Sequence, residues 1–380
     1  MKNMYLLLFY SLTIETTVYK LLDVFDKYLD DGNITISNRT ISFVFKLYPS
    51  IYEGKNIIKG SERIKNNLML KQIDYSKLNK KIYEFTSCLK NKMNKDNYAI
   101  LINNLEKNLS NSYEMKNPMI IIMDSCFFGH VGYTKYESEK SSIKYNLGLK
   151  IKSLQETIPF HELFHLSTIY IENNKSICGF RLDSLFGRML NEGYTEHMRE
   201  KYFGKNFLRP AKGYCVAKDI MGILEKIVGS DNMERCYLTA NMNELLNLMN
   251  KYISFEESHN LIRDIELVSF PFMFDFNFAR TLYTQNSYLI IKHRRVMNKY
   301  FYKIFNIERN LLKMYAVKLS QETDFSKEMI QRKTIGFFNE NFLELKKIAE
   351  LNEYNFQLYS FVESDILEIV DDVFEDKKQL

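Results

Sequence analysis

Three residues of one short segment have the types and the spacing that metal-assisted hydrolysis needs. They are His161, Glu162 and His165, in the order His-Glu-x-x-His. Helical residues four apart share a face, so both imidazoles can bind one ion at the usual Zn–N distance of about 2.0–2.1 Å. Glu162 is then offset to the side, where its carboxylate can take a proton from a water at the metal. His161 and His165 are therefore candidate metal ligands, and Glu162 is the candidate general base.

The residues before this motif predict that it lies on a helix. Thr157 is a suitable N-cap, and Pro159 falls in the first turn, where its missing N–H costs little. With six histidines in 380 residues, the motif would arise by chance in roughly one sequence in a hundred of this composition, so we favour a metal site. The alternative is a helix whose two histidines only form hydrogen bonds in the core.

A catalytic zinc ion needs a third protein ligand and one open position. A third histidine six residues after His165 is excluded, because Ile171 stands there and Thr168 replaces the glycine of that extended motif. The alternative is a carboxylate, and on this reasoning three glutamates are candidates: Glu172, Glu192 and Glu196.

A second helix is predicted over residues 182–202, and it contains the run Asn-Glu-Gly-Tyr-Thr-Glu from Asn191 to Glu196. Together with His-Glu-x-x-His on the preceding helix, this run resembles the motif of the gluzincins, the superfamily of thermolysin and the zinc aminopeptidases. Asn-Glu-Gly is similar to the aminopeptidase form. The resemblance covers about residues 117–204. It implies that Glu192 is the third ligand of Zn²⁺ and that Glu196 supports a ligating histidine.

The same resemblance implies two further features. The step from His165 to Glu192 is longer than in thermolysin, which implies an inserted loop around residues 172–181. A tyrosine or histidine from the later helical region should stabilise the oxyanion of the tetrahedral intermediate. No pattern singles out one donor among the 26 tyrosines and the remaining histidines. We consider Tyr214 and His259 first, with Tyr194 and His197 as further candidates.

The remaining pattern places these motifs in a larger architecture. The apolar run 119–123 predicts a buried strand, and the alternating run 142–150 predicts an edge strand. With the resemblance, this implies an α+β fold: a gluzincin (thermolysin-like) core with a small mixed sheet, two metal-binding helices and a helical C-terminal region. Helices of that region are predicted at residues 215–228, 242–251, 256–267 and 279–305. We expect three parts: an N-terminal helical and hairpin region (1–116), the zinc-binding catalytic core (117–204) and the helical C-terminal region (205–380).

Composition narrows the choice of partners and compartment. The net charge of +5 is a small difference between 52 basic and 47 acidic residues, and no run of five like charges indicates a nucleic-acid partner. Five scattered cysteines without a Cys-x-x-Cys pair favour the cytoplasm. The apolar run 4–14 lacks a following cleavage site, so we expect a buried strand or helix there instead of a signal peptide. No segment is apolar for long enough to predict a membrane span.

These expectations combine into a zinc metallopeptidase, in which Glu162 first accepts the proton of water and then protonates the leaving amine. By the resemblance, the strand at 142–150 would hold an extended peptide through main-chain hydrogen bonds, which favours a peptide or protein substrate. Two alternatives stay open. One is a catalytically silent binding or regulatory module with the same fold, and the other is an exported zinc protease or toxin.

Overall fold

Most of the part of the chain that the structure describes is helical. The computed structural model describes residues 23, 26, 75–114, 132–139, 142–149, 158–172, 175–180, 187–204, 215–269, 287–343, 345 and 362–378. Its helices are α4 (Tyr75–Lys90), α5 (Lys95–Glu114), α6 (Ile158–Leu166), α7 (Arg188–Phe203), α8 (Cys215–Val228), α9 (Ser230–Leu238), α10 (Met242–Met249), α11 (Phe255–Ser269), α13 (Ser287–Glu322), α14 (Lys327–Asn341) and α16 (Glu363–Lys378). Its strands are β1 (Gly132–Glu139), β2 (Ser142–Leu149), β3 (Ile169–Glu172) and β4 (Lys175–Cys178).

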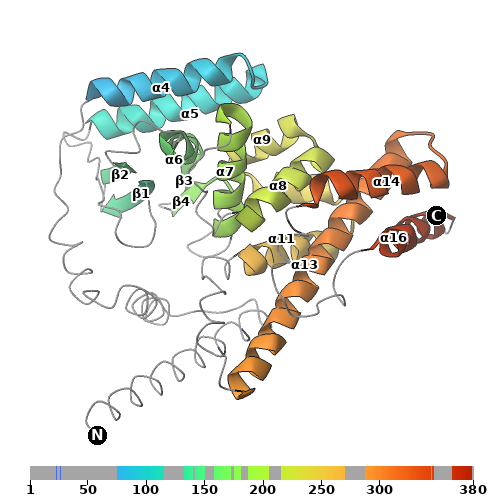
Figure 1. The fold of residues 1–380 in the computed structure, drawn as a ribbon. Coiled ribbons are helices and arrows are strands. Elements are labelled where there is room, and N and C mark those ends of the chain that lie inside the picture. The colour runs from blue at the N-terminus through green and yellow to red at the C-terminus, as the bar shows by residue number, and fades with distance from the viewer. Residues whose placement is uncertain are drawn as a thin grey trace, which may run out of the picture.

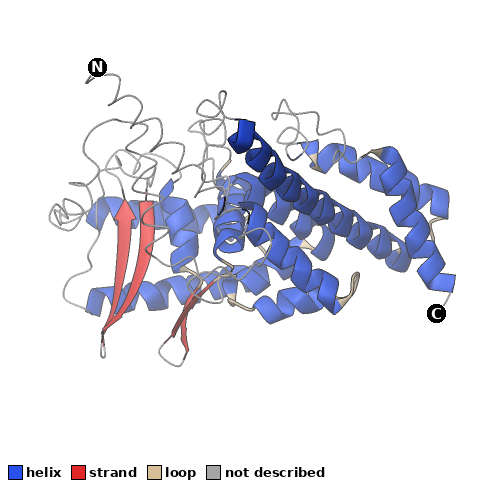
Figure 2. Ribbon diagram, turned by 90° about the horizontal axis from the view of Figure 1, so that it is seen from below, coloured by secondary structure: helices blue, strands red, loops and turns tan. Residues whose placement is uncertain are grey.

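The strands form two separate antiparallel hairpins. β1 pairs with β2 from Gly132 opposite Leu149 to Glu139 opposite Ser142, and β3 pairs with β4. Both hairpins lie on one side of the molecule, beside helices (Figure 2). The prediction of an α+β fold with a thermolysin-like mixed sheet is therefore wrong. The alternating run does form a strand, β2, but alternation shows which face is buried and not how many strands join the sheet.

The helices surround α7, which lies near the centre of Figure 1 between α6 and α8 and packs against both. α4 and α5 run side by side above α6, and β1 packs against α6 from another side. The long helix α13 crosses the C-terminal half, where α11, α14 and α16 pack against it. One cluster of buried apolar side chains extends from α4 through α6 and α7 to α13, so the two candidate metal-binding helices lie within the main core.

Several helices match their predictions, and the differences have local causes. α8 covers the predicted residues 215–228. α13 continues to Glu322 and not to residue 305, because no glycine or proline interrupts it before Ser326 caps α14 through the backbone N–H of Met329. The expected loop around residues 172–181 contains a strand, β4, which pairs antiparallel with β3.

Some predictions fall on positions that the structure does not describe. The apolar runs 4–14 and 119–123 and the residue Tyr214 lie outside the described residues. For Glu162 and Glu172 the backbone is described, in α6 and β3, but the side chains are not. None of the described helices is both long and apolar enough to cross a membrane.

Candidate metal centre

The helix α6 presents two histidines on one face and two phenylalanines on another. Phe160 and Phe164 are buried and pack against Phe85 of α4, with ring centroids 6.0 and 4.8 Å from it. Phe160 also contacts Phe203 at the end of α7, at 4.1 Å. Burial of this aromatic face fixes how α6 is rotated about its axis, and so directs His161 and His165 towards α7.

The C-terminal end of α6 is held by side chains of α5. The side-chain amide of Asn108 donates to the carbonyls of Leu166 and Ile169, at 2.8 and 3.2 Å. The amide of Asn104 donates to the carbonyl of Ser167 at 3.0 Å. Both asparagines are buried, and they bind the last carbonyl of α6 together with carbonyls of the turn and strand that follow it. A helix of only nine residues is thereby fixed in place.

The N-terminal end of α7 has an unusual cap. Gly187 takes the N-cap position with φ 79°, a left-handed conformation that favours glycine, and offers no side-chain hydrogen bond. The carboxylate of Glu266, from α11, accepts hydrogen bonds from the backbone N–H of Met189 at 3.0 Å and of Leu190 at 3.3 Å. The first turn of the helix that carries Glu192 is thus capped by a residue from the C-terminal half of the chain.

Close packing sets the other side of α7. A β-carbon added to Gly193 would lie 2.5 Å from the β-carbon of Ala217 in α8. The absence of a side chain at Gly193 therefore lets α7 and α8 approach closely.

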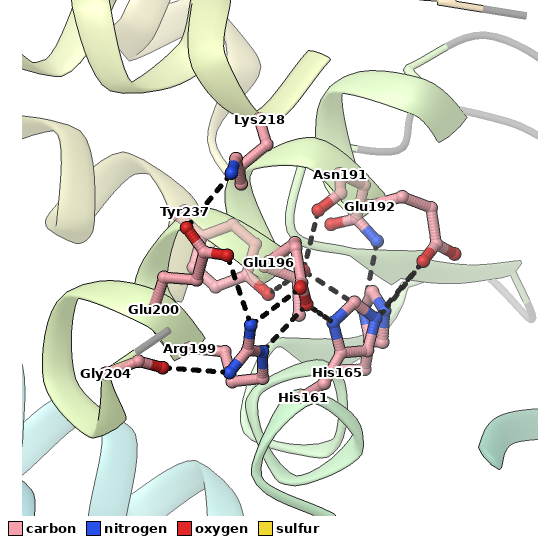
Figure 3. A network of polar contacts seen from close by, with 11 residues as sticks. His161, His165, Asn191, Glu192, Glu196, Arg199, Glu200, Gly204, Lys218 and Tyr237 are labelled. Atoms are coloured by element: carbon pink, nitrogen blue, oxygen red, sulfur yellow. Dashed lines mark hydrogen bonds and ion pairs between the residues drawn. The ribbon is translucent and has the colours of Figure 1, made fainter. Parts of the chain in front are cut away.

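The two histidines of α6 and Glu192 of α7 bring three ligand atoms together (Figure 3). Nε2 of His161 lies 3.1 Å from Nε2 of His165, and Oε2 of Glu192 lies 3.3 Å from each. Three ligands at 2.0–2.1 Å from a tetrahedral ion stand about 3.3–3.4 Å apart. The triangle therefore has the size of one face of a tetrahedral zinc site.

The charges in this triangle favour a cation between the three groups. Burial alone would raise the pKa of Glu192, but the charge of His165 and hydrogen bonds from both histidines hold it well below its usual value. Burial would likewise lower the pKa of His165, yet the Glu192 carboxylate outweighs that effect and the pKa is raised well above its usual value. The proton on His165 thus places a positive charge beside the Glu192 carboxylate. A divalent ion bound to the same three atoms would place a larger positive charge there. The donor set of two imidazoles and one carboxylate fits Zn²⁺.

Glu196 holds the far nitrogen of His161. Its Oε2 lies 3.1 Å from Nδ1 of His161. Burial alone would raise the pKa of Glu196, but hydrogen bonds from His161 and Arg199 lower it to about 2. An ionised carboxylate only accepts hydrogen bonds, so Nδ1 carries the proton and Nε2 is left with its lone pair towards the other two ligands.

Thr195 holds the far nitrogen of His165. Its Oγ1 lies 3.4 Å from Nδ1 of His165 and donates to the carbonyl of Asn191 at 2.6 Å. The hydroxyl of Tyr237, from α9, lies 2.6 Å from the same oxygen and can donate to it. Thr195 can then accept the Nδ1–H of His165, which again leaves Nε2 for a metal. The side-chain amide nitrogen of Asn191 lies 3.2 Å from the same Nδ1 and can only donate to it, so the contacts of Thr195 and Asn191 favour opposite tautomers of His165.

Comparisons of the chain with protein-family models, with curated proteins and with solved structures give no match. The interpretation of the centre therefore rests on its own geometry.

The structure separates the other predicted site residues from this group. Tyr194 donates its hydroxyl to Glu225 of α8 at 2.5 Å, and His197 lies 3.5 Å from the same carboxylate. Both thus lie on the face of α7 opposite Glu192. His259 is exposed on α11, where Nδ1 lies 2.9 Å from the carbonyl of Phe255. None of these three lies beside the ligand triangle.

Sequence reasoning missed four residues that support the centre: Asn104, Asn108, Tyr237 and Glu266. Each lies 42 to 77 residues from the group that it holds, and none is marked by a local pattern. Arg199 was also missed, although its spacing of three residues from Glu196 is a standard signal for a helical ion pair.

Proposed function

We propose that this protein is a zinc-dependent hydrolase that cleaves peptide bonds in a peptide or protein substrate. The observation that carries the proposal is the triangle of His161, His165 and Glu192, with Glu162 directly after the first ligand in the sequence. If these three residues, which are buried or half-buried, held a zinc ion, they would leave room for water or substrate, as catalytic rather than structural zinc sites do.

Each residue then has a definite task. Zn²⁺, when bound, would polarise a substrate carbonyl and lower the pKa of a water at its open position. Glu162 would accept the proton of that water and pass it to the leaving amine. Glu196 would keep the proton of His161 on the nitrogen away from the metal. Support for peptide as the substrate comes from the gluzincin-like motif and from β1, which packs against α6 and belongs to a hairpin whose outer edge could add an extended chain.

We place the protein in the cytoplasm, because the cysteines suggest a reducing compartment. Among the described cysteines Cys88, Cys178 and Cys236 are free thiols. Detection of the protein in culture medium would favour an exported protease instead.

The decisive experiment measures zinc content and hydrolysis on the same purified protein. Wild type should contain one zinc ion per chain and should cleave members of a broad quenched-fluorescence peptide library. Glu162→Gln should keep the zinc and lose about 10²–10⁴-fold in kcat, because only the base is removed. Absence of stoichiometric zinc, or unchanged hydrolysis by Glu162→Gln, would overturn the proposal.

Two variants test the ligand assignment separately. Glu192→Gln should lose zinc, whereas Glu172→Gln, the matched change at the rival glutamate, should keep it. Zinc bound without cleavage of any library peptide would favour a binding module over a peptidase.

A further inference from the structure

Arg199 is a buried cation beside the metal centre that the proposed chemistry does not use directly. It lies one turn after Glu196 on α7, and it is 2% exposed. Its Nε donates to Oε2 of Glu196 at 3.0 Å, and its Nη2 donates to Oε1 at 2.8 Å (Figure 3). Both oxygens of the carboxylate that touches His161 are therefore fixed by one guanidinium.

We propose that Arg199 is a positioning residue of the metal centre, which holds Glu196 so that His161 presents Nε2 to the metal. This inference rests on the proposed zinc site. A glutamate has three side-chain torsions, and one hydrogen bond to an imidazole leaves its carboxylate free to turn. A bidentate arginine pair fixes both the position and the plane of the carboxylate. Oε2 then stays 3.1 Å from Nδ1 of His161.

The guanidinium is itself held by two further contacts. Nη1 donates to the carbonyl of Gly204, at the end of α7, at 3.1 Å. Nη2 lies 3.4 Å from Oε1 of Glu200, whose other oxygen accepts from Lys218 of α8 at 3.0 Å. Positive and negative groups alternate from Glu196 to Lys218, so no charge in this row lacks a partner of opposite sign. Lysine at position 199 could not reproduce these contacts, because an ammonium is a point charge without the planar fork.

The same contact decides which glutamate of α7 binds the metal. Glu192 and Glu196 are four residues apart on one helix face, so spacing alone allows either of them to reach the ion. Arg199 keeps Glu196 at the far nitrogen of His161, which leaves Glu192 as the ligand. Loss of Arg199 should therefore disturb the ligand set itself, in addition to the stability of α7.

The test is a double-mutant cycle on the full-length protein with zinc affinity as the readout, measured by competition with a chromophoric chelator. Arg199→Met should weaken zinc binding about 10- to 100-fold, the usual effect of losing an outer partner of a metal ligand. It should also shift the visible absorption bands of the Co²⁺-substituted protein. Arg199→Lys should restore only part of the affinity. In a Glu196→Gln background, Arg199→Met should have a clearly smaller effect on zinc affinity, because the charged acceptor through which it acts is gone.

The double variant also guards against misfolding. Arg199→Met alone leaves a buried carboxylate without its cation, whereas the combination with Glu196→Gln removes both charges. Arg235→Met is the matched control, because Arg235 binds Glu244 through Nε and Nη2 at an exposed position of α9. It should leave zinc affinity unchanged.

Three outcomes overturn the inference, and they are distinguishable from failure of the zinc site. Wild-type zinc affinity in Arg199→Met would show that the arginine has no effect on the metal. An undiminished effect in the Glu196→Gln background would show that it acts through the fold alone. An equal loss in Arg235→Met would show a general effect of removing an arginine. If wild type itself binds no zinc, the proposed function fails together with this inference.

Discussion

Each histidine of the candidate metal centre contacts a different residue of α7 at its second nitrogen. An ionised carboxylate, Glu196, serves His161, and a hydroxyl, Thr195, serves His165. The two supporting residues are adjacent in the sequence, and each has a further partner, Arg199 or Tyr237. The hydrogen bond at one imidazole nitrogen decides whether the other nitrogen is free to bind a metal, so these contacts matter to the candidate centre alongside the ligands themselves.

At the scale of single residues, Gly193 controls how closely α7 approaches α8. In Gly193→Ala the new β-carbon would lie 2.5 Å from the β-carbon of Ala217 and 2.7 Å from its carbonyl carbon, so backbone would have to move. We expect the free energy of unfolding to fall by about 1–3 kcal/mol, the usual cost of overpacking. Urea denaturation in the presence of a chelator measures this change without a contribution from metal.

Gly336→Ala is the matched control for that substitution. Gly336 also lies within a helix, α14, but a β-carbon there would meet nothing within 4 Å. Alanine should therefore stabilise the protein by about 0.5–1 kcal/mol, because it restricts the unfolded chain and favours the helix. Equal effects of the two substitutions would contradict the argument from close packing.

At the scale of elements, both helices of the candidate metal centre are fixed by partners from elsewhere in the chain. The C-terminal carbonyls around α6 are bound by Asn104 and Asn108 of α5. The N-terminal amides of α7 are bound by Glu266 of α11. The relative placement of His161, His165 and Glu192 thus depends on helices outside the motif-bearing segment, which gives the N-terminal and C-terminal regions a structural share in the site.

Removal of the Glu266 carboxylate should loosen the first turn of α7. We expect Glu266→Ala to lower the free energy of unfolding by about 1–3 kcal/mol, because two backbone amides lose a buried, charged acceptor. Zinc affinity should fall as well, since Glu192 follows those amides within one turn. Urea denaturation and chelator competition measure the two effects on one preparation.

Glu257→Ala provides the comparison for that prediction. Glu257 accepts the backbone N–H of Ser254 before α11, but at a partly exposed position where water can replace it. Its loss should cost at most about 1 kcal/mol and leave zinc affinity unchanged. A zinc affinity equally affected by both alanine variants would argue against a specific role of the α7 cap.

The sequence predicts those features of this site that depend on short spacings. His161 and His165 are four residues apart, as are Glu192 and Glu196, and helical geometry alone places each pair on one face. Two other features were not predicted. The end of α13 depends on the cap of the next helix, and the hairpin of β3 and β4 depends on pairing between short strands. Glu266 and Tyr237 carry no signal at all, since periodicity says which face is buried but not what covers it.

At the scale of the whole molecule, buried carboxylates fall into two electrostatic classes. Burial alone would raise the pKa of Glu225, but His197 and Lys201 lower it to about 2, so this group stabilises the fold at neutral pH and ceases to do so as the pH falls towards 2. Glu308 of α13 is also buried, and burial raises its pKa to about 8. The two classes should therefore give opposite dependences of stability on pH.

Glu308 should destabilise the protein increasingly between pH 5 and pH 8. The folded protein keeps the proton of Glu308 up to about pH 8, whereas the unfolded chain releases it above the ordinary pKa of 4.5. The folded state thus binds more protons in this interval, and the free energy of unfolding must fall as the pH rises. Over the full interval the contribution reaches roughly 5 kcal/mol as an upper limit. Glu308→Gln has no proton to lose, so its stability advantage over wild type should grow with pH and level off above pH 8.

Urea denaturation of both proteins at several pH values from 5 to 8 measures this difference, in which the contributions of all other groups cancel. Glu328→Gln is the control, because Glu328 is exposed on α14 and hydrogen bonds from its own backbone and from Ser326 lower its pKa. Glu328 is ionised in both states above pH 5, so its difference from wild type should stay constant. A constant difference for Glu308→Gln as well would mean that the carboxyl of Glu308 reaches water or a cation in the folded protein.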